Sequence, residues 1–171
     1  IRACRTTAMG YVQYCCVDCG EVHHILRSCG HRFCPTCGVV NTNKWAEDTL
    51  SNLLNIKHHH VVVTLPAWLR PMANRNSVLI YNLMFSASQK VIKDWFDYKH
   101  SLEPGIISVL HTAGSDLKYH PHIHMIVTGG GMKESQVSLL EGDYLFAQSW
   151  FKSRFRWQFQ QGLIAAYDEG D

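Results

Sequence analysis

The sequence predicts an α+β protein, in which a cysteine-rich amino-terminal module precedes a mainly antiparallel β-sheet covered by helices on one face. Three observations lead to this prediction. All seven cysteines lie within the first 37 residues. Two short β-branched runs, 58–65 and 106–111, and an alternating segment at 120–128 are typical of strands. Segments with helical periodicity separate and follow them, which gives the order β-α-β-β-α.

Composition sets the scale of the fold. With 171 residues, 46% hydrophobic and 18% charged, the chain is long enough for one ordinary domain plus a small appendage. No apolar run reaches the length of a membrane span, and no signal peptide opens the chain, so we expect no membrane partner. Because the sequence starts at Ile1 and stops at Asp171 without a clear end, we expect a piece of a longer protein. A net charge of +2 is too small to indicate a nucleic-acid partner by itself.

We expect three parts along the chain: a cysteine-rich module over 1–44, a connecting helix within 45–57, and a larger domain over 58–171. The elements expected in order are a helix from 41 or 42 to about 57, a strand over 58–65, a helix over 74–99, a turn at 103–105, a strand over 106–111, a loop over 112–119, the strand at 120–128, a glycine turn at 129–131, a helix start at Ser135, and a helix over 143–167.

The amino-terminal module repeats one short motif. In both copies, two residues separate two cysteines and a glycine follows, a spacing that lets two thiolates reach one tetrahedral ion. We therefore predict a structural zinc site formed by Cys16, Cys19, Cys34 and Cys37. Cys15 is an alternative to Cys16. Disulfides are a poorer interpretation, because a secreted disulfide protein would not usually confine its cysteines to one end.

Further metal ligands and cations lie close to this repeat. Cys4, Cys29 and His31 predict a second zinc site, with spare thiols as the alternative. Arg5 and Arg32 make the module basic, which predicts contact with a DNA backbone, although basic residues on such a module are often plain surface.

The segment from 120 to 128 alternates imidazoles with apolar side chains. Because successive side chains of a strand point to opposite faces, His122 and His124 share one face, whereas Ile123, Met125 and Val127 fill the other and pack on a core. Neutral imidazole is a common ligand of divalent cations. The segment therefore predicts half of a metal site on the exposed face of the sheet.

A third ligand would complete that site. His111 ends the strand that precedes His122 and His124, so a hairpin between the two strands would bring it beside one of them. Asp116 and His120 are the alternatives.

The last predicted helix interleaves cations with aromatic residues. Aromatic rings stack on bases and cations meet phosphates, so this pattern predicts a groove for a single strand of nucleic acid. A helix with a solvated basic face is the alternative. The cations are Lys152, Arg154 and Arg156, and the aromatic residues are Phe151, Phe155 and Trp157.

Together these motifs resemble the zinc-binding transposases of rolling-circle insertion sequences, within the HUH endonuclease superfamily. The resemblance extends from the first residues to about Gly131. It implies that 58–171 is an HUH-type endonuclease domain, incomplete at its carboxyl end, in a bacterial cytoplasmic protein that joins the nucleoid when bound to DNA. It rests on Cys4-Arg5-Thr6, the two cysteine motifs, Trp45, the strand at 61–66, Leu110-His111-Thr112 and Pro121-His122-Ile123-His124.

The resemblance also implies a reaction. His122 and His124, with a third ligand such as His111, would hold Mg²⁺ or Mn²⁺ against the scissile phosphate of single-stranded DNA at transposon ends. A tyrosine hydroxyl would then attack and leave a 5′-phosphotyrosine for strand transfer. No small-molecule substrate is expected.

The nucleophilic tyrosine of that family is not found in this chain. Its sequence context is missing before the last residue, and Tyr144 and Tyr167 are only weak candidates. We therefore expect the nucleophile outside this chain, and the chain alone to be inactive as a nuclease. Two alternative functions are a histidine-triad nucleotide hydrolase, which the two cysteine motifs disfavour, and a remnant that binds DNA through its zinc module without catalysis.

Overall fold

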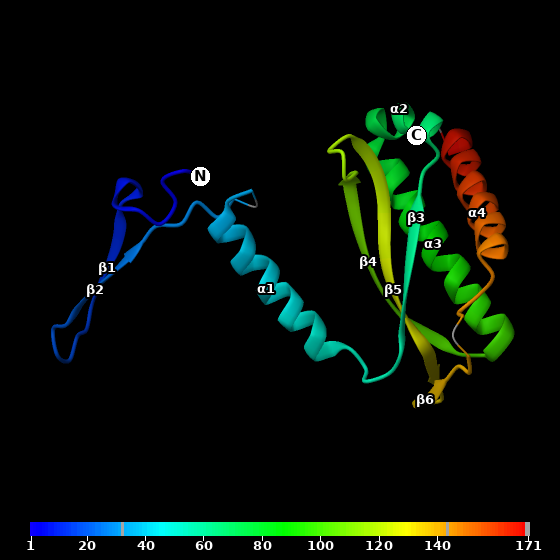
Figure 1. Ribbon diagram of the computed structural model, residues 1–171, viewed down its shortest axis with the longest axis horizontal. Coiled ribbons are helices and arrows are strands. Elements are labelled where there is room, and N and C mark those ends of the chain that lie inside the picture. Colours follow the sequence, from blue (N-terminus) through cyan, green and yellow to red (C-terminus); the bar gives the residue numbers. More distant parts are fainter. Residues whose placement is uncertain (32, 143, 170–171) are drawn as a thin grey trace. The chain divides into compact units, whose positions relative to one another are not determined.

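The computed structural model describes residues 1–31, 33–142 and 144–169. It divides into two compact units, Ile1–Leu54 and Asn55–Asp171, which are treated separately below (Figure 1). Arg32, one of the residues predicted to contact DNA, lies outside the described residues.

The amino-terminal unit consists of a hairpin and a helix. Strands β1 (Tyr11–Cys15) and β2 (Val22–Leu26) pair in antiparallel fashion. Helix α1 (Pro35–Asn52) follows. The predicted helix start at 41 or 42 and end at 57 are therefore both wrong. Pro35 is favoured in the first turn because its fixed φ suits a helix and its missing N–H has no partner there anyway.

The larger unit is built on one antiparallel sheet, which confirms the predicted fold class. The strand order is β3-β5-β4, and β6 pairs with β5. The predicted succession of strands and helices is present, with β6 in addition. The elements are β3 (His58–Thr64), α2 (Arg70–Arg75), α3 (Ser77–His100), β4 (Glu103–Ala113), β5 (Tyr119–Lys133), β6 (Gln136–Leu139) and α4 (Gln148–Glu169).

Helices α3 and α4 lie together against one face of this sheet (Figure 1). Ile123, Met125 and Val127 of β5 are completely buried on that face, as their alternation with histidine predicts. They belong to one hydrophobic core with residues of both helices, including Phe96 of α3 and Phe159 of α4. Each fully buried side chain of this size contributes about 1.5–3 kcal/mol of transfer free energy. The opposite face of β5 is left for polar side chains.

The predicted helix over 74–99 is divided in two. Asn76 has φ −121° and ψ 50°, which interrupts the helical backbone between α2 and α3. The shorter helix also begins earlier than predicted, at Arg70, with Pro71 in its first turn.

The predicted turn at 129–131 lies inside β5, and its three residues are buried. Glycine is needed there because neighbouring backbones approach closely. A Cβ on Gly131 would lie 2.7 Å from the carbonyl oxygen of Glu103, and one on Gly129 would lie 2.9 Å from that of Lys57.

Two further sequence-based boundaries are corrected at the edges of the sheet. The predicted turn at 103–105 belongs to β4, where Pro104 precedes a shift in register; proline is tolerated there because β4 lies at the end of the strand order. Ser135 starts no helix. With Glu134 it takes positive φ, 46° and 69° for Glu134 and Ser135, and forms the tight turn between β5 and β6. Within the described residues, no helix is both long and apolar enough to cross a membrane.

Candidate metal centres

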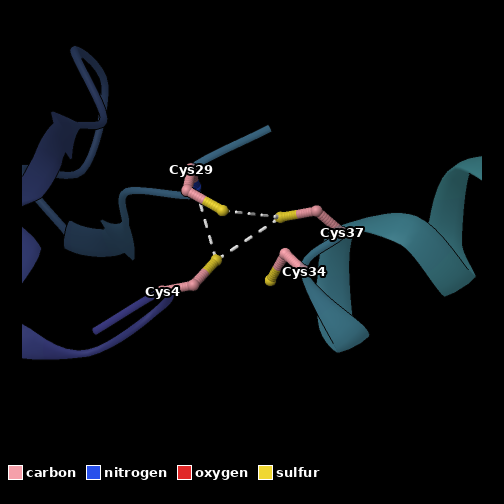
Figure 2. Close-up of side chains that lie close together, drawn as sticks. All are labelled: Cys4, Cys29, Cys34 and Cys37. Atoms are coloured by element: carbon pink, nitrogen blue, oxygen red, sulfur yellow. Dashed lines mark hydrogen bonds between the residues drawn. The ribbon is translucent and has the colours of Figure 1, made fainter. Parts of the chain in front are cut away.

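Four cysteine side chains of the amino-terminal unit converge on one point: Cys4, Cys29, Cys34 and Cys37 (Figure 2). Their sulfur atoms all lie within 4.8 Å of one another, with Cys4 Sγ 3.4 Å and Cys29 Sγ 4.0 Å from Cys37 Sγ. Thiolates on one tetrahedral zinc ion, at a Zn–S distance of about 2.3 Å, lie about 3.8 Å apart. The cluster therefore has the size and the donor set of a structural zinc site.

Two local structures position the four sulfurs. The chain enters β1 and leaves β2 at the same end of the hairpin, so Cys4 and Cys29 lie side by side and the Cys29 amide donates to Cys4 Sγ at 3.3 Å. Cys34 is the extended residue before α1, and Cys37 lies in the first turn of that helix. Both are nearly inaccessible to solvent, with exposed fractions of 2% and 5%.

Two thiols of this cluster have pKa values shifted in opposite directions. The Cys37 amide, helped by the Thr36 amide, lowers the pKa of Cys34 to about 6 against the effect of burial. The Cys29 amide also acts to lower the pKa of Cys4, but burial and the neighbouring thiols outweigh it and raise that pKa to about 12. Four thiolates within 4.8 Å of one another would repel, and Zn²⁺ supplies the positive charge that offsets this repulsion.

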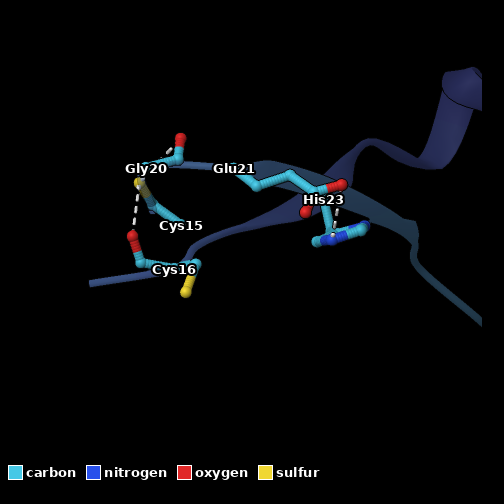
Figure 3. Close-up of polar contacts among 5 residues, drawn as sticks. All are labelled: Cys15, Cys16, Gly20, Glu21 and His23. Atoms are coloured by element: carbon cyan, nitrogen blue, oxygen red, sulfur yellow. Dashed lines mark hydrogen bonds and ion pairs between the residues drawn. The ribbon is translucent and has the colours of Figure 1, made fainter. Parts of the chain in front are cut away.

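Cys16 and Cys19, the other half of the predicted cysteine tetrad, lie elsewhere. They occupy the turn between β1 and β2 and are exposed, next to Cys15, whose thiol donates to the carbonyl oxygens of Cys16 and Gly20 at 3.7 Å each (Figure 3). The predicted grouping of both cysteine motifs in one site is therefore corrected. Two five-residue strands separate this turn from the end of the hairpin where the cluster forms.

The remaining predicted site residues of this unit are also accounted for. Cys4 and Cys29, predicted as a second site, belong to the cluster itself. His31 does not, because its Nδ1 accepts from the Phe33 amide at 3.2 Å. Arg5 is exposed at φ 57° beside the cluster.

Three imidazoles meet on the face of the larger sheet that is opposite the core. His111 of β4 lies directly across from His122 of β5, and His124 is the next residue on the same face. The ring centroids of His111 and His124 are 4.5 Å apart, those of His111 and His122 5.3 Å, and those of His122 and His124 4.9 Å. One ring nitrogen of each lies within 4.8 Å of the other two. We call these three residues the histidine triad.

Hydrogen bonds engage the Nδ1 atoms of two of these rings. His122 Nδ1 lies 2.7 Å from the carbonyl oxygen of His120, so Nδ1 carries the proton and Nε2 keeps its lone pair. His124 Nδ1 lies 2.8 Å from Nε2 of His60 on β3, with the two rings stacked 6° from parallel. Donation from His124 Nδ1–H to His60 leaves Nε2 of His124 available as well. Both histidines can therefore present Nε2 to one cation.

Burial lowers the pKa of His124, and the neighbouring charges of His111, His122 and His60 lower it further. The neutral form, which is the metal-binding form of imidazole, is therefore favoured. Sequence reasoning missed His60. Its signal was the run of three histidines at the start of β3, where the middle position faces away from the other two.

The two alternative third ligands have other partners. The carboxylate of Asp116 accepts from the Lys118 amide at 3.2 Å and pairs with Lys118 Nζ at 3.1 Å, and these two bonds are the main cause of its lowered pKa. The ring of His120 accepts from Arg70 Nη2 at 2.6 Å. Neither belongs to the triad.

The basic residues predicted for a nucleic-acid groove lie on α4, which packs on the opposite face of the sheet from the triad. Arg154 lines a cavity of about 290 Å³ between α3 and α4, with Trp95, Trp150 and Trp157 among its neighbours. Lys152 and Arg156 are exposed on the same helix.

Neither candidate tyrosine belongs to the triad's surroundings. Tyr144 lies in the connection that leads into α4 and is 91% exposed, and Tyr167 lies near the end of α4 and is 83% exposed. Neither makes a described hydrogen bond that would activate its hydroxyl, within the residues that the structure covers.

Comparison with known proteins matches two parts of the chain to family models. Residues 1–65 match the model of a transposase zinc-binding domain, and residues 105–171 match that of a putative transposase. The first match contains the cysteine cluster, and the second contains the whole histidine triad.

Two curated proteins are similar to this chain. A putative transposase, y4qJ, from Sinorhizobium fredii is 34% identical over 99% of this chain and 44% of its own length. The transposase for insertion sequence element IS801 from Pseudomonas savastanoi pv. phaseolicola is 34% identical over 79% of this chain and 33% of its own length. The chain thus spans less than half the length of these relatives. With its four-cysteine cluster and its two matched domains, the chain belongs to the zinc-binding transposases of insertion sequences.

Proposed function

We propose that this chain is part of a transposase of the HUH type, which nicks single-stranded DNA at the ends of a mobile element and transfers the strand. The observation that supports this most strongly is the histidine triad. Three imidazoles converge on the exposed face of a sheet, with one ring nitrogen of each within 4.8 Å of the other two, and the hydrogen bonds of His122 and His124 engage Nδ1. The printed names of both relatives are those of transposases.

His111, His122 and His124 are the proposed ligands of Mg²⁺ or Mn²⁺. Bound there, such an ion would polarise the scissile phosphate and offset the negative charge that develops on the leaving 3′ oxygen. The three histidines themselves would hold the ion in place. Because β4 and β5 are adjacent paired strands, the three rings are held by a continuous hydrogen-bonded sheet, and rigid elements hold ligand geometry better than loops.

The proposed strand cleavage is a transesterification. A tyrosine oxygen attacks the phosphorus, the bond from phosphorus to the 3′ oxygen breaks, and the 3′-hydroxyl leaves with the proton that the tyrosine gave up. The 5′ phosphate remains on the tyrosine, so the bond energy is kept for joining to another strand. We propose that this tyrosine lies outside residues 1–171.

The amino-terminal unit has a separate proposed role, which is to bind the DNA at the element's end. Its fold depends on the zinc site, and Arg5 beside the cluster adds positive charge. The alternative function, a nucleotide hydrolase with the motif His120-x-His122-x-His124, gains no support from either matched domain.

Titration with Mn²⁺ tests the proposed metal site in the zinc-loaded chain. We expect one Mn²⁺ to bind, and alanine at His111, His122 or His124 to weaken its affinity at least ten-fold. His23→Ala is the matched control, because His23 lies on β2 of the other unit and pairs only with Glu21 among the described contacts. Unchanged Mn²⁺ affinity in all three triad variants would refute the site.

A second experiment tests the reaction with a chain extended beyond Asp171 to the length of its relatives. We expect a covalent adduct with single-stranded DNA hairpins that requires Mn²⁺ and is lost in His122→Ala. An adduct that forms equally well without metal and in this variant would contradict the proposed mechanism.

A further inference from the structure

One cation near the histidine triad has no role in the site described so far. Arg70 is the first residue of α2, and its guanidinium reaches across to β5, where Nη2 donates to His120 Nδ1 at 2.6 Å. His120 is two residues before His122, and their ring centroids are 5.2 Å apart. Arg70 therefore lies one imidazole away from the triad.

The positive charge of Arg70 is not neutralised by a carboxylate. Among the described residues, no acidic group forms an ion pair with it, and its Nε is buried without a hydrogen-bond partner. Asp116 is the acidic side chain on which the charge of Arg70 acts, and it lines the same cavity, but its carboxylate pairs with Lys118 at 3.1 Å and not with Arg70. Because Nε is inaccessible, a ligand would meet the terminal nitrogens of the guanidinium.

This guanidinium faces a cavity that is continuous with the triad. The cavity has a volume of about 680 Å³ and is bounded by Arg70, His111, His120, His122 and the loop from 113 to 116. Two of its walls, His111 and His122, are members of the triad. A molecule that fills this cavity therefore touches the proposed metal site and Arg70 together.

The donors that face the cavity suit a phosphodiester. Because Arg70 donates to Nδ1 of His120, that ring holds its proton on Nε2 and supplies a second N–H donor. Arginine offers a planar fork that matches two oxygens of a phosphate, and such bonds to charged groups are stronger than neutral ones.

We propose that Arg70 and His120 form a binding subsite for a backbone phosphate of single-stranded DNA next to the phosphate that lies on the histidine triad. The inference rests on the proposed function, because it assigns a substrate contact within the same site. Holding the neighbouring phosphate fixes the strand along the sheet, which is the positioning that an in-line displacement needs. His120 orients the guanidinium as well as donating.

The test measures binding of a fluorescein-labelled oligothymidylate of fifteen nucleotides by anisotropy. It uses the zinc-loaded chain with no added Mg²⁺ or Mn²⁺, so that the triad holds neither ion while the amino-terminal site keeps its zinc. Arg70→Gln should weaken binding about ten-fold and flatten the dependence of log K on log salt by about 0.7, the amount expected for one phosphate contact on a single strand. Arg70→Lys keeps the charge, so the salt slope should persist while affinity falls by a smaller factor.

Arg75→Gln is the matched control, since it removes one exposed arginine from the same short helix. It should change affinity less than two-fold. Binding by Arg70→Gln within two-fold of wild type would overturn the inference, as would an equal loss in Arg75→Gln or a failure of the wild-type chain to bind the oligonucleotide. Circular dichroism of each variant establishes that it is folded.

Two further arms separate the sources of failure. Inorganic phosphate, added while the ionic strength is held constant, should compete with the oligonucleotide for the wild-type chain but not for Arg70→Gln. Equal competition in both would overturn the subsite. Mn²⁺ affinity should be unchanged in Arg70→Gln. If the triad variants lose Mn²⁺ binding and Arg70→Gln weakens oligonucleotide binding as expected, both proposals are supported. If Arg70→Gln weakens oligonucleotide binding but the wild-type chain binds no Mn²⁺, the subsite is supported and the nicking mechanism is refuted.

Discussion

Substitution of single cysteines distinguishes the four-cysteine cluster of the structure from the zinc site that motif spacing favours. We expect Cys29→Ala to lose zinc, because Cys29 Sγ lies 4.0 Å from Cys37 Sγ within the cluster. Cys16→Ala should keep one equivalent of zinc, because Cys16 is exposed at the far turn of the hairpin. The two residues belong to the same small unit, so each variant controls for the other.

The size of the effect follows from how little else holds this unit together. Among its described residues, only Cys34 and Cys37 are buried. A unit without a hydrophobic core must take most of its folding free energy from the metal, about 10–16 kcal/mol in small zinc modules. A thousand-fold loss of zinc affinity would alone remove about 4 kcal/mol. The amino-terminal unit should therefore unfold in Cys29→Ala, while the larger unit keeps its own core.

Metal content and local order are the two readouts. Zinc per chain is measured after gel filtration, and amide hydrogen exchange reports protection of β1, β2 and α1 separately from the larger sheet. Full loss of protection in the first unit with an intact second unit is the expected result for Cys29→Ala. Zinc retained by Cys29→Ala but lost by Cys16→Ala would refute the cluster.

Three more predictions concern the larger unit. His60→Leu should weaken Mn²⁺ binding by about 10–100-fold without loss of folding, because it removes the partner of His124 Nδ1 at 2.8 Å. His60→Gln should recover much of the Mn²⁺ affinity, because its side chain can accept the same hydrogen bond. A calorimetric titration of both variants checks this prediction. Met125→Ala should destabilise the fold by about 2–5 kcal/mol in urea, because Met125 is completely buried, whereas Val62→Ala, at a position 46% exposed, should cost little. Burial and the Tyr81 hydroxyl at 2.8 Å raise the pKa of Tyr119 from 10.0 to about 12, so the stability from its neutral form is present below pH 10 and lost as the pH rises towards 12; thermal melts should show this loss in wild type and a smaller one in Tyr119→Phe.

The histidine triad was predictable because each step depended on local sequence. Alternation fixed the shared face of His122 and His124, and the short connection after His111 fixed the pairing of two successive strands. His60 and Arg70 lie near the triad for a different reason: β3 pairs with β5, and α2 follows β3 in the chain. No local pattern sets that neighbourhood, so sequence reasoning could not bring either residue to the site.

The cysteine cluster shows a different limit. The two-residue spacing between Cys34 and Cys37 indicates that they can share an ion, but it does not indicate which other two cysteines complete the site. The hairpin decides that question, because it brings Cys4 to Cys29 and carries Cys16 away. The glycines at 129–131 were misread for a related reason. Glycine permits both a turn and a close approach of backbones, and only the neighbouring strands distinguish the two.

The placement of the two tyrosines leads to a prediction about activity. A nucleophile must come within about 3–3.5 Å of phosphorus, on the face that carries the triad. Tyr167 lies on α4, which packs against the other face of the sheet, and Tyr144 lies in the connection leading into that helix. We therefore expect the isolated chain to form no covalent adduct with single-stranded DNA in the presence of Mn²⁺, even when it binds both the DNA and the ion. Denaturing gels with end-labelled hairpins check this, with the extended chain as the positive control. An adduct on the isolated chain that disappears in Tyr144→Phe or Tyr167→Phe would show that α4 or its connection can reach the triad, and would contradict the separation of nucleophile and metal site across the sheet.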